Sequence, residues 1–170
     1  MGKAFKIIVA GPFNAGKSEF IRTASDIPVV STDRKITDEL AVVKETTTVA
    51  MDYGHVTVAG DLFHLYGTPG QERFNFMWDI LAREMDGLLV LVDSSDRFSL
   101  TVARRILRHF RRRSQAPMLV VATKQDKTGV MLPAEIAERL NIRPLVMVVP
   151  CDPRQKSSTR QVLQQLSVVL

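Results

Sequence analysis

One short segment limits the fold of this chain more than any other. The pattern G-x-x-x-x-G-K-[ST] is matched without a gap by residues 11–18, GPFNAGKS. The apolar run 5–10 before it has the length of a buried strand, and Lys17–Ala24 after it has a helical pattern. The segment therefore predicts a strand, a tight turn and a helix at the start of an α/β domain.

This turn has the chemistry of a phosphate-binding loop. Backbone N–H groups around residues 14–18 would form a concave nest at the positive end of the following helix. Gly16 lets the backbone approach closely, Lys17 would reach the β and γ oxygens, and the Ser18 hydroxyl would bind Mg²⁺. The alternative is a glycine-containing turn that binds nothing.

Further apolar runs of strand length alternate with helical patterns along the chain. We expect strands at residues 49–58, 61–66, 87–92, 118–122 and 145–149, and helices at 72–84, 100–113, 133–140 and 157–170. The order predicts one domain over residues 1–170, a doubly wound α/β fold. Its mostly parallel sheet would have six strands with one antiparallel edge hairpin, and helices on both faces. Residues 26–45 show no clear periodicity, and loops this long are often functional.

Composition supports a folded domain in a reducing compartment. A chain of 170 residues buries about 70% of its unfolded surface. Its one cysteine excludes an internal disulfide. No apolar run approaches the roughly 18 residues of a membrane span. We expect a cytoplasmic protein, with any peripheral attachment at the inner face of the membrane made through a partner.

The positive charge is concentrated in one segment. The net charge is +5, but residues 96–113 hold seven arginines and one acid, so the rest of the chain is close to neutral. We expect no nucleic-acid binding, because this stretch lacks interleaved aromatic residues and any helix-turn-helix or zinc pattern. The basic helix at 97–113 leaves three interpretations open: a solvated face, an acidic partner, or an anionic membrane surface.

A second motif indicates recognition of a nucleotide base. The residues after the apolar run 118–122 are Thr123-Lys124-Gln125-Asp126. They resemble the N/T-K-x-D motif of the Ras-like small GTPases. Asp126 would accept from guanine N1–H and the 2-amino group, a donor pair that adenine lacks, and the Lys124 stem would cover the ring. Thr123 replaces the commoner asparagine. The alternative is an ordinary polar loop between a strand and a helix.

Other segments resemble the switch regions of that family. Residues 67–74 resemble D-x-x-G-Q-E, where Gly70 would offer its N–H to the γ-phosphate and Gln71 would orient the attacking water. Residues 46–53 resemble the end of switch I, where Thr48 would bind Mg²⁺; Thr47 is the alternative register. The resemblance places switch I at about 26–48 and switch II at about 67–78.

The last motif follows the final expected strand. Cys151-Asp152 stands where the family has its S-A-K loop, and the resemblance implies that the N–H of Asp152 contacts guanine O6. It implies Gln71 and Lys17 as catalytic residues, and Ser18 and Thr48 as Mg²⁺ ligands. The implied GTP- or GDP-binding residues are Gly11, Asn14, Ala15, Gly16, Lys17, Ser18, Glu19, Thr48, Gly70, Thr123, Lys124, Asp126, Cys151 and Asp152.

The chain also departs from the family pattern. Gly67 replaces an aspartate that holds Mg²⁺ through water, with Asp52 and Asp93 as candidates to replace it. Phe13 is bulky; it either crowds Gln71 or packs outward. In the last loop Asp-Pro replaces Ala-Lys. The sequences Gly-Thr-Pro-Gly-Gln and Thr-Thr-Val-Ala-Met-Asp resemble prokaryotic members more than eukaryotic Ras. These members are the MglA-type polarity GTPases and the conservon-type small GTPases of bacteria.

The resemblance implies a molecular switch that binds GTP or GDP with Mg²⁺ and hydrolyses GTP slowly. The aligned motifs contain no evident catalytic arginine, so Arg34 or Arg73 in cis, or a partner, would supply that charge. We expect a regulatory protein, an activating or exchange factor that could be of the roadblock type, and an effector that binds the switch regions. The alternatives are a nucleotide-binding scaffold with little hydrolysis and an ATP-using P-loop enzyme; Asp126 argues against the latter.

Overall fold

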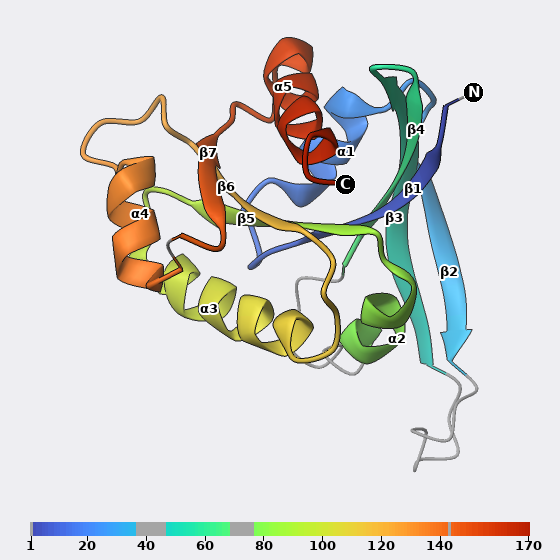
Figure 1. Ribbon diagram of the computed structural model, residues 1–170, viewed down its shortest axis with the longest axis horizontal. Coiled ribbons are helices and arrows are strands. Elements are labelled where there is room, and N and C mark those ends of the chain that lie inside the picture. The colour runs from blue at the N-terminus through green and yellow to red at the C-terminus, as the bar shows by residue number, and fades with distance from the viewer. Residues whose placement is uncertain (1, 37–46, 69–76, 143) are drawn as a thin grey trace.

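The computed structural model describes residues 2–36, 47–68, 77–142 and 144–170. A seven-stranded sheet runs through it in the order β2-β3-β4-β1-β5-β6-β7 (Figure 1). The five strands from β4 to β7 in this order are parallel, and β3 pairs antiparallel with both β4 and β2. The strands are β1 (Ala4–Ala10), β2 (Val30–Ile36), β3 (Thr47–Val58), β4 (Asp61–Gly67), β5 (Gly87–Asp93), β6 (Met118–Thr123) and β7 (Met147–Pro150).

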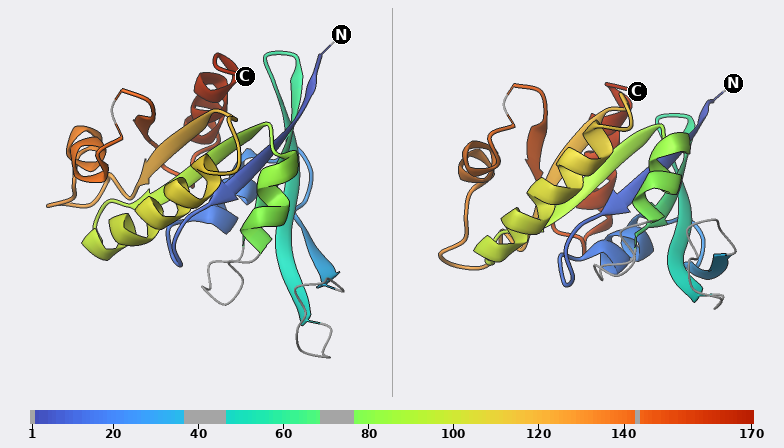
Figure 2. Two further views of the ribbon diagram at one scale, coloured as in Figure 1. Left: turned by 60° about the horizontal axis from the view of Figure 1, so that its bottom comes forward. Right: turned by 90° about the horizontal axis from the view of Figure 1, so that it is seen from below.

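Helices cover both faces of the sheet (Figure 2). Helices α1 and α5 contact each other and pack on one face; α2, α3 and α4 form a row of contacts on the other. The helices are α1 (Lys17–Ala24), α2 (Met77–Glu84), α3 (Arg97–Arg111), α4 (Pro133–Leu140) and α5 (Lys156–Ser167). The expected doubly wound α/β class is confirmed.

The sheet has one strand more than the six expected. Strand β2 lies within the segment that shows no periodicity, and its sequence VSTDRKI is largely polar. It pairs along its whole length with β3, from Val30 opposite Tyr53 to Ile36 opposite Thr47. An edge strand of this kind is held by backbone hydrogen bonds to a distant segment, so its own residues carry little apolar signal.

The start of α3 differs from expectation by three residues, and that of α2 cannot be compared. Helix α3 begins at Arg97 because the Asp96 side chain accepts a hydrogen bond from the N–H of Phe98, a cap before the apolar periodicity starts. Helix α2 begins at Met77, and residues 69–76, where the helix was expected to start, lie outside the described residues. No helix in the described part of the chain is long and apolar enough to cross a bilayer.

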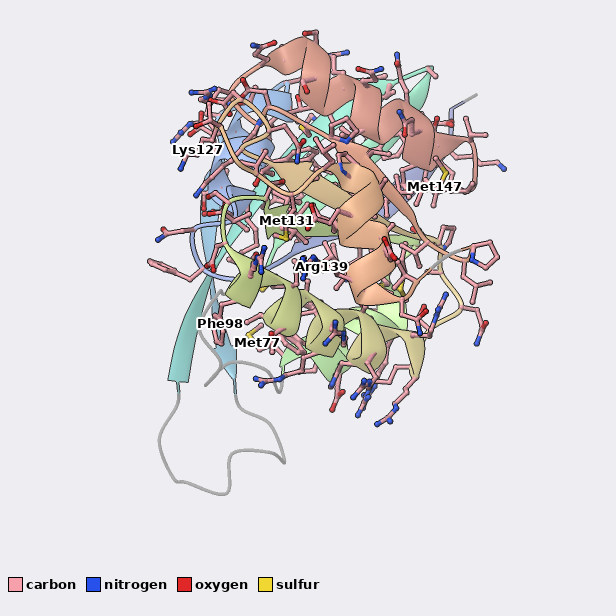
Figure 3. The ribbon with its side chains drawn as sticks, turned by 90° about the vertical axis from the view of Figure 1, so that its left-hand side faces the viewer. Met77, Phe98, Lys127, Met131, Arg139 and Met147 are labelled. Carbon is pink, nitrogen blue, oxygen red and sulfur yellow. The ribbon has the colours of Figure 1, made fainter. Side chains whose placement is uncertain are left out.

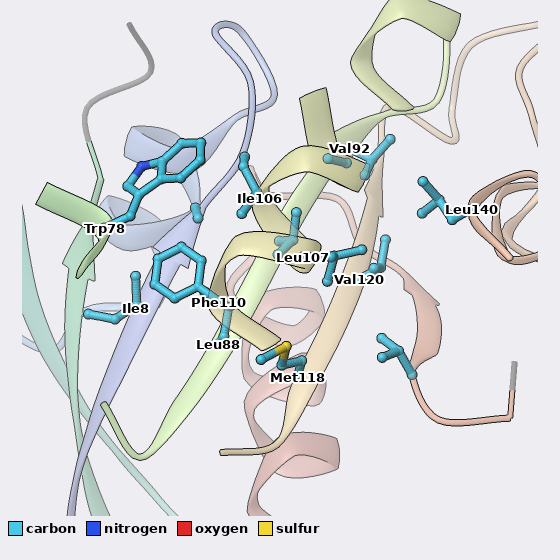
Figure 4. Close-up of a cluster of buried hydrophobic side chains, with 14 of the residues drawn as sticks. Ile8, Trp78, Leu88, Val92, Ile106, Leu107, Phe110, Met118, Val120 and Leu140 are labelled. Atoms are coloured by element: carbon cyan, nitrogen blue, oxygen red, sulfur yellow. The ribbon is translucent and has the colours of Figure 1, made fainter. Parts of the chain in front are cut away.

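The core is divided into two layers by the sheet. Under α2, α3 and α4, Phe110 is fully buried and packs against Trp78, with 6.0 Å between the centroids of the two rings (Figure 4). Under α1 and α5, Phe20 and Phe63 are fully buried. Strands β1, β5 and β6 supply both layers, because they are covered on both faces and read as continuous apolar runs. They form the rigid base for the loops at their carboxyl ends.

Candidate functional site

The turn between β1 and α1 has the conformation that its sequence predicts. Gly11 has φ +150°, and a Cβ atom there would lie 2.5 Å from the carbonyl oxygen of Leu91. Gly16 caps α1 with a left-handed φ of +99°. Both positions therefore require glycine. The turn wraps around the buried Ala15, whose N–H donates to the Pro12 carbonyl at 3.2 Å, with Asn14 exposed at its tip.

Lys17 lies inside this turn. Its Nζ donates to the carbonyl oxygens of Gly11 and Pro12 at 2.6 and 2.9 Å. Desolvation lowers the pKa of Lys17 to about 8, and the nearby carboxylate of Asp52 works in the opposite direction. The cation is thus held, incompletely solvated, where an anion would be bound.

Asp52 supplies the carboxylate that contacts the Ser18 hydroxyl. The Ser18 hydroxyl donates to Asp52 Oδ2 at 2.5 Å, across from β3 to the start of α1. Gly67, at the end of β4, leaves room for this: a Cβ there would lie 2.9 Å from Ile21 Cδ1 and 3.5 Å from Asp52 Cβ. Asp52 on the neighbouring strand β3 therefore places a carboxylate beside Ser18, where β4 has none.

Asp93, the other candidate, belongs to a different part of the site. Its Oδ2 lies 2.6 Å from Lys124 Nζ, and its Oδ1 accepts from Ser95. Burial raises its pKa, but the hydrogen bonds from Lys124 and Ser95 outweigh burial and hold the pKa below its usual value. Asp93 thus anchors the Lys124 side chain rather than Ser18.

A cavity of about 480 Å³ opens over the phosphate-type turn. Phe13 stands at its rim with 72% of its surface exposed, so the ring neither packs into the core nor closes the cavity. Arg22 also lines it, but its guanidinium is paired with Glu19. The lining residues are Phe13, Asn14, Gly16, Lys17, Ser18, Glu19, Arg22, Asp52, Gly67 and Thr68.

The loop after β6 is tied to the turn. Thr123 is fully buried, and its hydroxyl lies 2.9 Å from the Ala15 carbonyl and 3.0 Å from that of Val92. Its side chain therefore supports the loop from beneath. Lys124 follows in the left-handed region with φ +60°, which projects its side chain toward Asp93.

A second cavity of about 350 Å³ lies between this loop and the loop after β7. Asp126 is 55% exposed, and its Oδ2 accepts from Arg154 Nη2 at 3.2 Å. Gly16 and Glu19 line both this cavity and the first one, so the two cavities are adjacent, and together they are called the cleft. The second cavity is lined by Gly16, Glu19, Lys124, Asp126, Lys127, Asp152, Pro153 and Arg154.

The loop after β7 differs from expectation in its backbone. The N–H of Asp152, expected to face a base, donates to Ser158 Oγ at 2.9 Å. Cys151 is buried; burial raises the pKa of its thiol to about 11, so it is an inert packing group. The sequence analysis did not predict a role for Arg154. Its two acidic partners, Asp126 and the nearby Asp152, could have indicated one.

The remaining expected residues are only partly described. Thr48 lies on β3, where its backbone stands opposite Lys35 of β2. Gly70, Gln71 and Arg73 lie outside the described residues. The described part of the chain holds no cluster of three or more His, Cys, Asp or Glu side chains that could bind a metal by itself.

The Lys17 pKa gives a pH test on the ligand-free protein. The unfolded chain keeps the proton up to about pH 10.5 and the folded chain up to about pH 8, so stability rises with pH between these values. We expect wild type to gain up to about 3 kcal/mol relative to Lys17→Met across that window. Urea unfolding at pH 7.5, 8.5 and 9.5 measures it; a difference that stays constant with pH contradicts the burial of this cation.

Comparison with known proteins agrees with this geometry. The model of the ADP-ribosylation factor family, Arf, matches residues 1–169. The chain is 28% identical over 148 residues to ADP-ribosylation factor-like protein 5 of Caenorhabditis elegans, covering 85% of this chain and 76% of that protein. It is 36% identical over 89 residues to ADP-ribosylation factor-like protein 4D of Mus musculus, covering 51% of this chain and 44% of that protein.

Two further matches are more distant. An uncharacterized protein of Methanocaldococcus jannaschii is 30% identical over 91 residues, covering 53% of this chain and 51% of that protein. The Arl6 (BBS3) small GTPase of Trypanosoma brucei, solved with the nucleotide analogue GppNp, superposes with a TM-score of 0.73 at 19% identity. It covers 97% of this chain and 96% of that one, and it shows the shared fold. Because the family model spans nearly the whole chain, the protein belongs to the Arf family of Ras-like P-loop small GTPases.

Proposed function

We propose that this protein is a Mg²⁺-dependent switch that binds GTP and GDP and hydrolyses GTP slowly. One observation carries the proposal. The two cavities adjoin at Gly16 and Glu19, so that the cleft has Lys17 and Ser18 at one end and Asp126 at the other. A guanosine phosphate has the matching order of groups, an anionic tail and a base edge with two adjacent donors.

The phosphate end suits a triphosphate. The N-terminus of α1, the turn backbone and the partly desolvated Lys17 all present positive charge to the same cavity. These groups would neutralise charge that develops on the γ-phosphate during transfer. Gln71 would orient the attacking water, in the role that the family resemblance gives it.

The residues at this end also fit Mg²⁺. Ser18 and Asp52 form a hydroxyl–carboxylate pair inside the cavity, and oxygen groups of this kind are what Mg²⁺ prefers. Ser18 would bind the ion directly, and Asp52 would hold its hydration shell, with Thr48 as the second direct ligand. When bound, the ion neutralises the phosphate oxygens.

A scaffold with little hydrolysis is the second candidate. The exposed ring of Phe13 at the cavity rim is the observation that favours it, because a bulky group at the rim narrows the space for an attacking water. Slow turnover follows in either case, since the described cavity offers no free arginine: Arg22 is paired with Glu19.

As a switch the protein needs partners, which we propose by class. A regulatory protein, an activating or exchange factor of the roadblock type, would control the nucleotide state, and an effector would bind the switch regions at 26–48 and 67–78. This choice of regulator rests on the resemblance of the switch segments to MglA-type and conservon-type proteins of bacteria, which stays a prediction. We place the protein in the cytoplasm.

The basic face on α3 supplies a second docking surface. A cavity of about 450 Å³ between α3 and α4 has an apolar floor that includes Leu107, Leu140 and Ile142. Arg104 donates to the carbonyl of Arg139 at 2.6 Å, and Figure 3 shows Arg139 on α4. Four arginines surround the floor, with no acid among the described lining residues: Arg104, Arg108, Arg111 and Arg139.

This combination favours an acidic partner protein that inserts an apolar side chain. Guanidinium groups match carboxylates in geometry as well as charge. A flat membrane surface would meet the arginines but leave the concave apolar floor unused. The face lies on the layer opposite α1, away from the nucleotide cleft (Figure 2).

The first test of the proposed function is identification of the nucleotide bound to the purified protein, followed by single-turnover hydrolysis at saturating Mg²⁺. We expect GDP or GTP, no displacement by ATP, and a wild-type rate roughly tenfold or more above that of Gln71→Leu. Equal inertness of the two proteins supports the scaffold instead. Displacement by ATP as readily as by GTP contradicts the assignment of Asp126.

The Mg²⁺ assignment has its own test. We expect Asp52→Asn to raise, by about tenfold, the Mg²⁺ concentration that half-maximally slows GDP release, because an amide holds coordinated water less well than a carboxylate. Release of fluorescent GDP during Mg²⁺ titration measures this. Asp61→Asn, at the far end of the β3–β4 hairpin, is the matched control. An unchanged Mg²⁺ dependence in Asp52→Asn excludes its role.

The basic face is tested by charge reversal. We expect Arg108→Glu with Arg111→Glu to keep GDP binding and to weaken, roughly tenfold, the binding of a glutamate-rich peptide with a central leucine. Arg97→Glu, exposed on the same helix, is the control and should bind as wild type. Fluorescence anisotropy measures the peptide, and co-sedimentation measures phosphatidylserine-containing vesicles. Vesicle binding without peptide binding assigns the face to a membrane.

A further inference from the structure

The loop after β7 has no backbone donor left for guanine O6. The N–H of Cys151 donates to the Ala122 carbonyl at 3.0 Å, and that of Asp152 donates to Ser158 Oγ. Pro153 has no N–H. The next donor along the chain, the N–H of Arg154, is bonded to Asp152 Oδ1 at 3.0 Å. A base bound against Asp126 would meet a loop whose backbone donors are all in use.

The Arg154 side chain lies beside this gap and is held in place. Its Nε and Nη2 reach the two carboxylate oxygens of Asp152, each at 2.9 Å, which forms a bidentate fork. The same Nη2 reaches Asp126 Oδ2 at 3.2 Å. The side chain lines the base cavity, and 62% of it is exposed. Because this fork already restricts the Arg154 side chain, the side chain loses less rotational freedom when it binds a ligand than an unpaired arginine would.

One nitrogen of this guanidinium remains for a ligand. An arginine has five N–H donors, and its Nε and Nη2 donate to Asp152 and Asp126. Within the described residues, no acceptor is bonded to Nη1. A carboxylate and a guanidinium thus stand side by side at the mouth of the base cavity, offering acceptors next to donors.

Guanine carries the complementary pattern along one edge. Its 2-amino group and N1–H donate, and the adjacent O6 accepts, whereas adenine has a donor in place of O6. We propose that Arg154 donates from Nη1 to guanine O6 and reads the base together with Asp126. This inference rests on the proposed function, because it assigns a specificity residue within that same cleft.

A 6-thioguanine nucleotide isolates this contact. It keeps N1–H and the 2-amino group but replaces O6 with sulfur, a weaker acceptor. Competition against fluorescent GDP on the full chain gives Kd for GDP and for 6-thio-GDP. We expect wild type to prefer GDP by roughly tenfold, as one charge-assisted hydrogen bond supplies. In Arg154→Met the GDP affinity should fall by about that factor, 6-thio-GDP affinity should stay, and the preference should disappear.

Two controls keep the result specific. Arg160→Met removes an arginine of α5 that pairs with Asp26 at 2.8 Å, outside the cavity lining, and should keep the wild-type preference. Arg154→Lys keeps the charge but not the fork, and should lose most of the preference. Equal melting temperatures of the variants show that the fold is intact, as expected for an exposed side chain.

Several outcomes overturn the inference. An unchanged preference in Arg154→Met excludes the contact, and so does a wild type that binds both nucleotides equally, although GDP binding then stands. Loss or gain of the preference in Ser158→Ala, without an effect of Arg154→Met, assigns O6 to the N–H of Asp152. A chain that binds neither nucleotide removes the proposed function and this inference together.

Discussion

The buried hydroxyl of Thr123 fixes the distance between the two ends of the cleft. It stands between the carbonyls of Ala15 and Val92, at 2.9 and 3.0 Å, and has no contact with solvent. It therefore joins the phosphate-type turn to the loop that carries Asp126, across 108 residues of sequence. A buried hydroxyl without partners would cost about 1–3 kcal/mol, so this geometry is strongly preferred. The phosphate-type turn and the loop that carries Asp126 are thereby held in a fixed relation to each other.

The charged side chains of the cleft are paired with one another. Lys124 is paired with Asp93, and Arg154 bridges Asp152 and Asp126. At the other end, the Ser18 hydroxyl donates to Asp52. Such fixed groups need little rearrangement when a charged ligand replaces water, which is the basis of electrostatic preorganisation. Cys151, by contrast, is a buried thiol with a raised pKa and takes no part in charge chemistry.

The sequence predicted the parts of the molecule that depend on local pattern. The apolar runs of β1, β5 and β6 and the turn at residues 11–18 follow from period and spacing, and the structure confirms them. Strand β2 was missed because an edge strand is defined by its partner rather than by its own residues. Likewise, only the structure could show that Asp52 rather than Asp93 contacts Ser18, because this depends on the register of β3 against β4, which brings Tyr53 opposite Tyr66.

The same limit explains the loop after β7. Its position along the chain predicted that it borders the base; this stays a prediction, and the structure shows that the loop lines the same cavity as Asp126. The backbone hydrogen bond from Asp152 to Ser158 could not be predicted, because it depends on how α5 begins. The role of Phe13 was left open between crowding Gln71 and packing outward. The ring is exposed at the cavity rim and does not pack into the core, and the crowding of Gln71 stays a prediction because Gln71 lies outside the described residues.

The carboxylate that contacts Ser18 comes from β3, and this origin has a mechanical consequence. Asp52 immediately precedes Tyr53, the first residue of β3 that pairs with β4. The pairing of β3 with β4 therefore sets the position of the Asp52 carboxylate relative to Ser18. A slip of β3 by a single residue would turn the Asp52 side chain to the other face of the sheet, so the contact between Asp52 and Ser18 depends on the register of one hairpin.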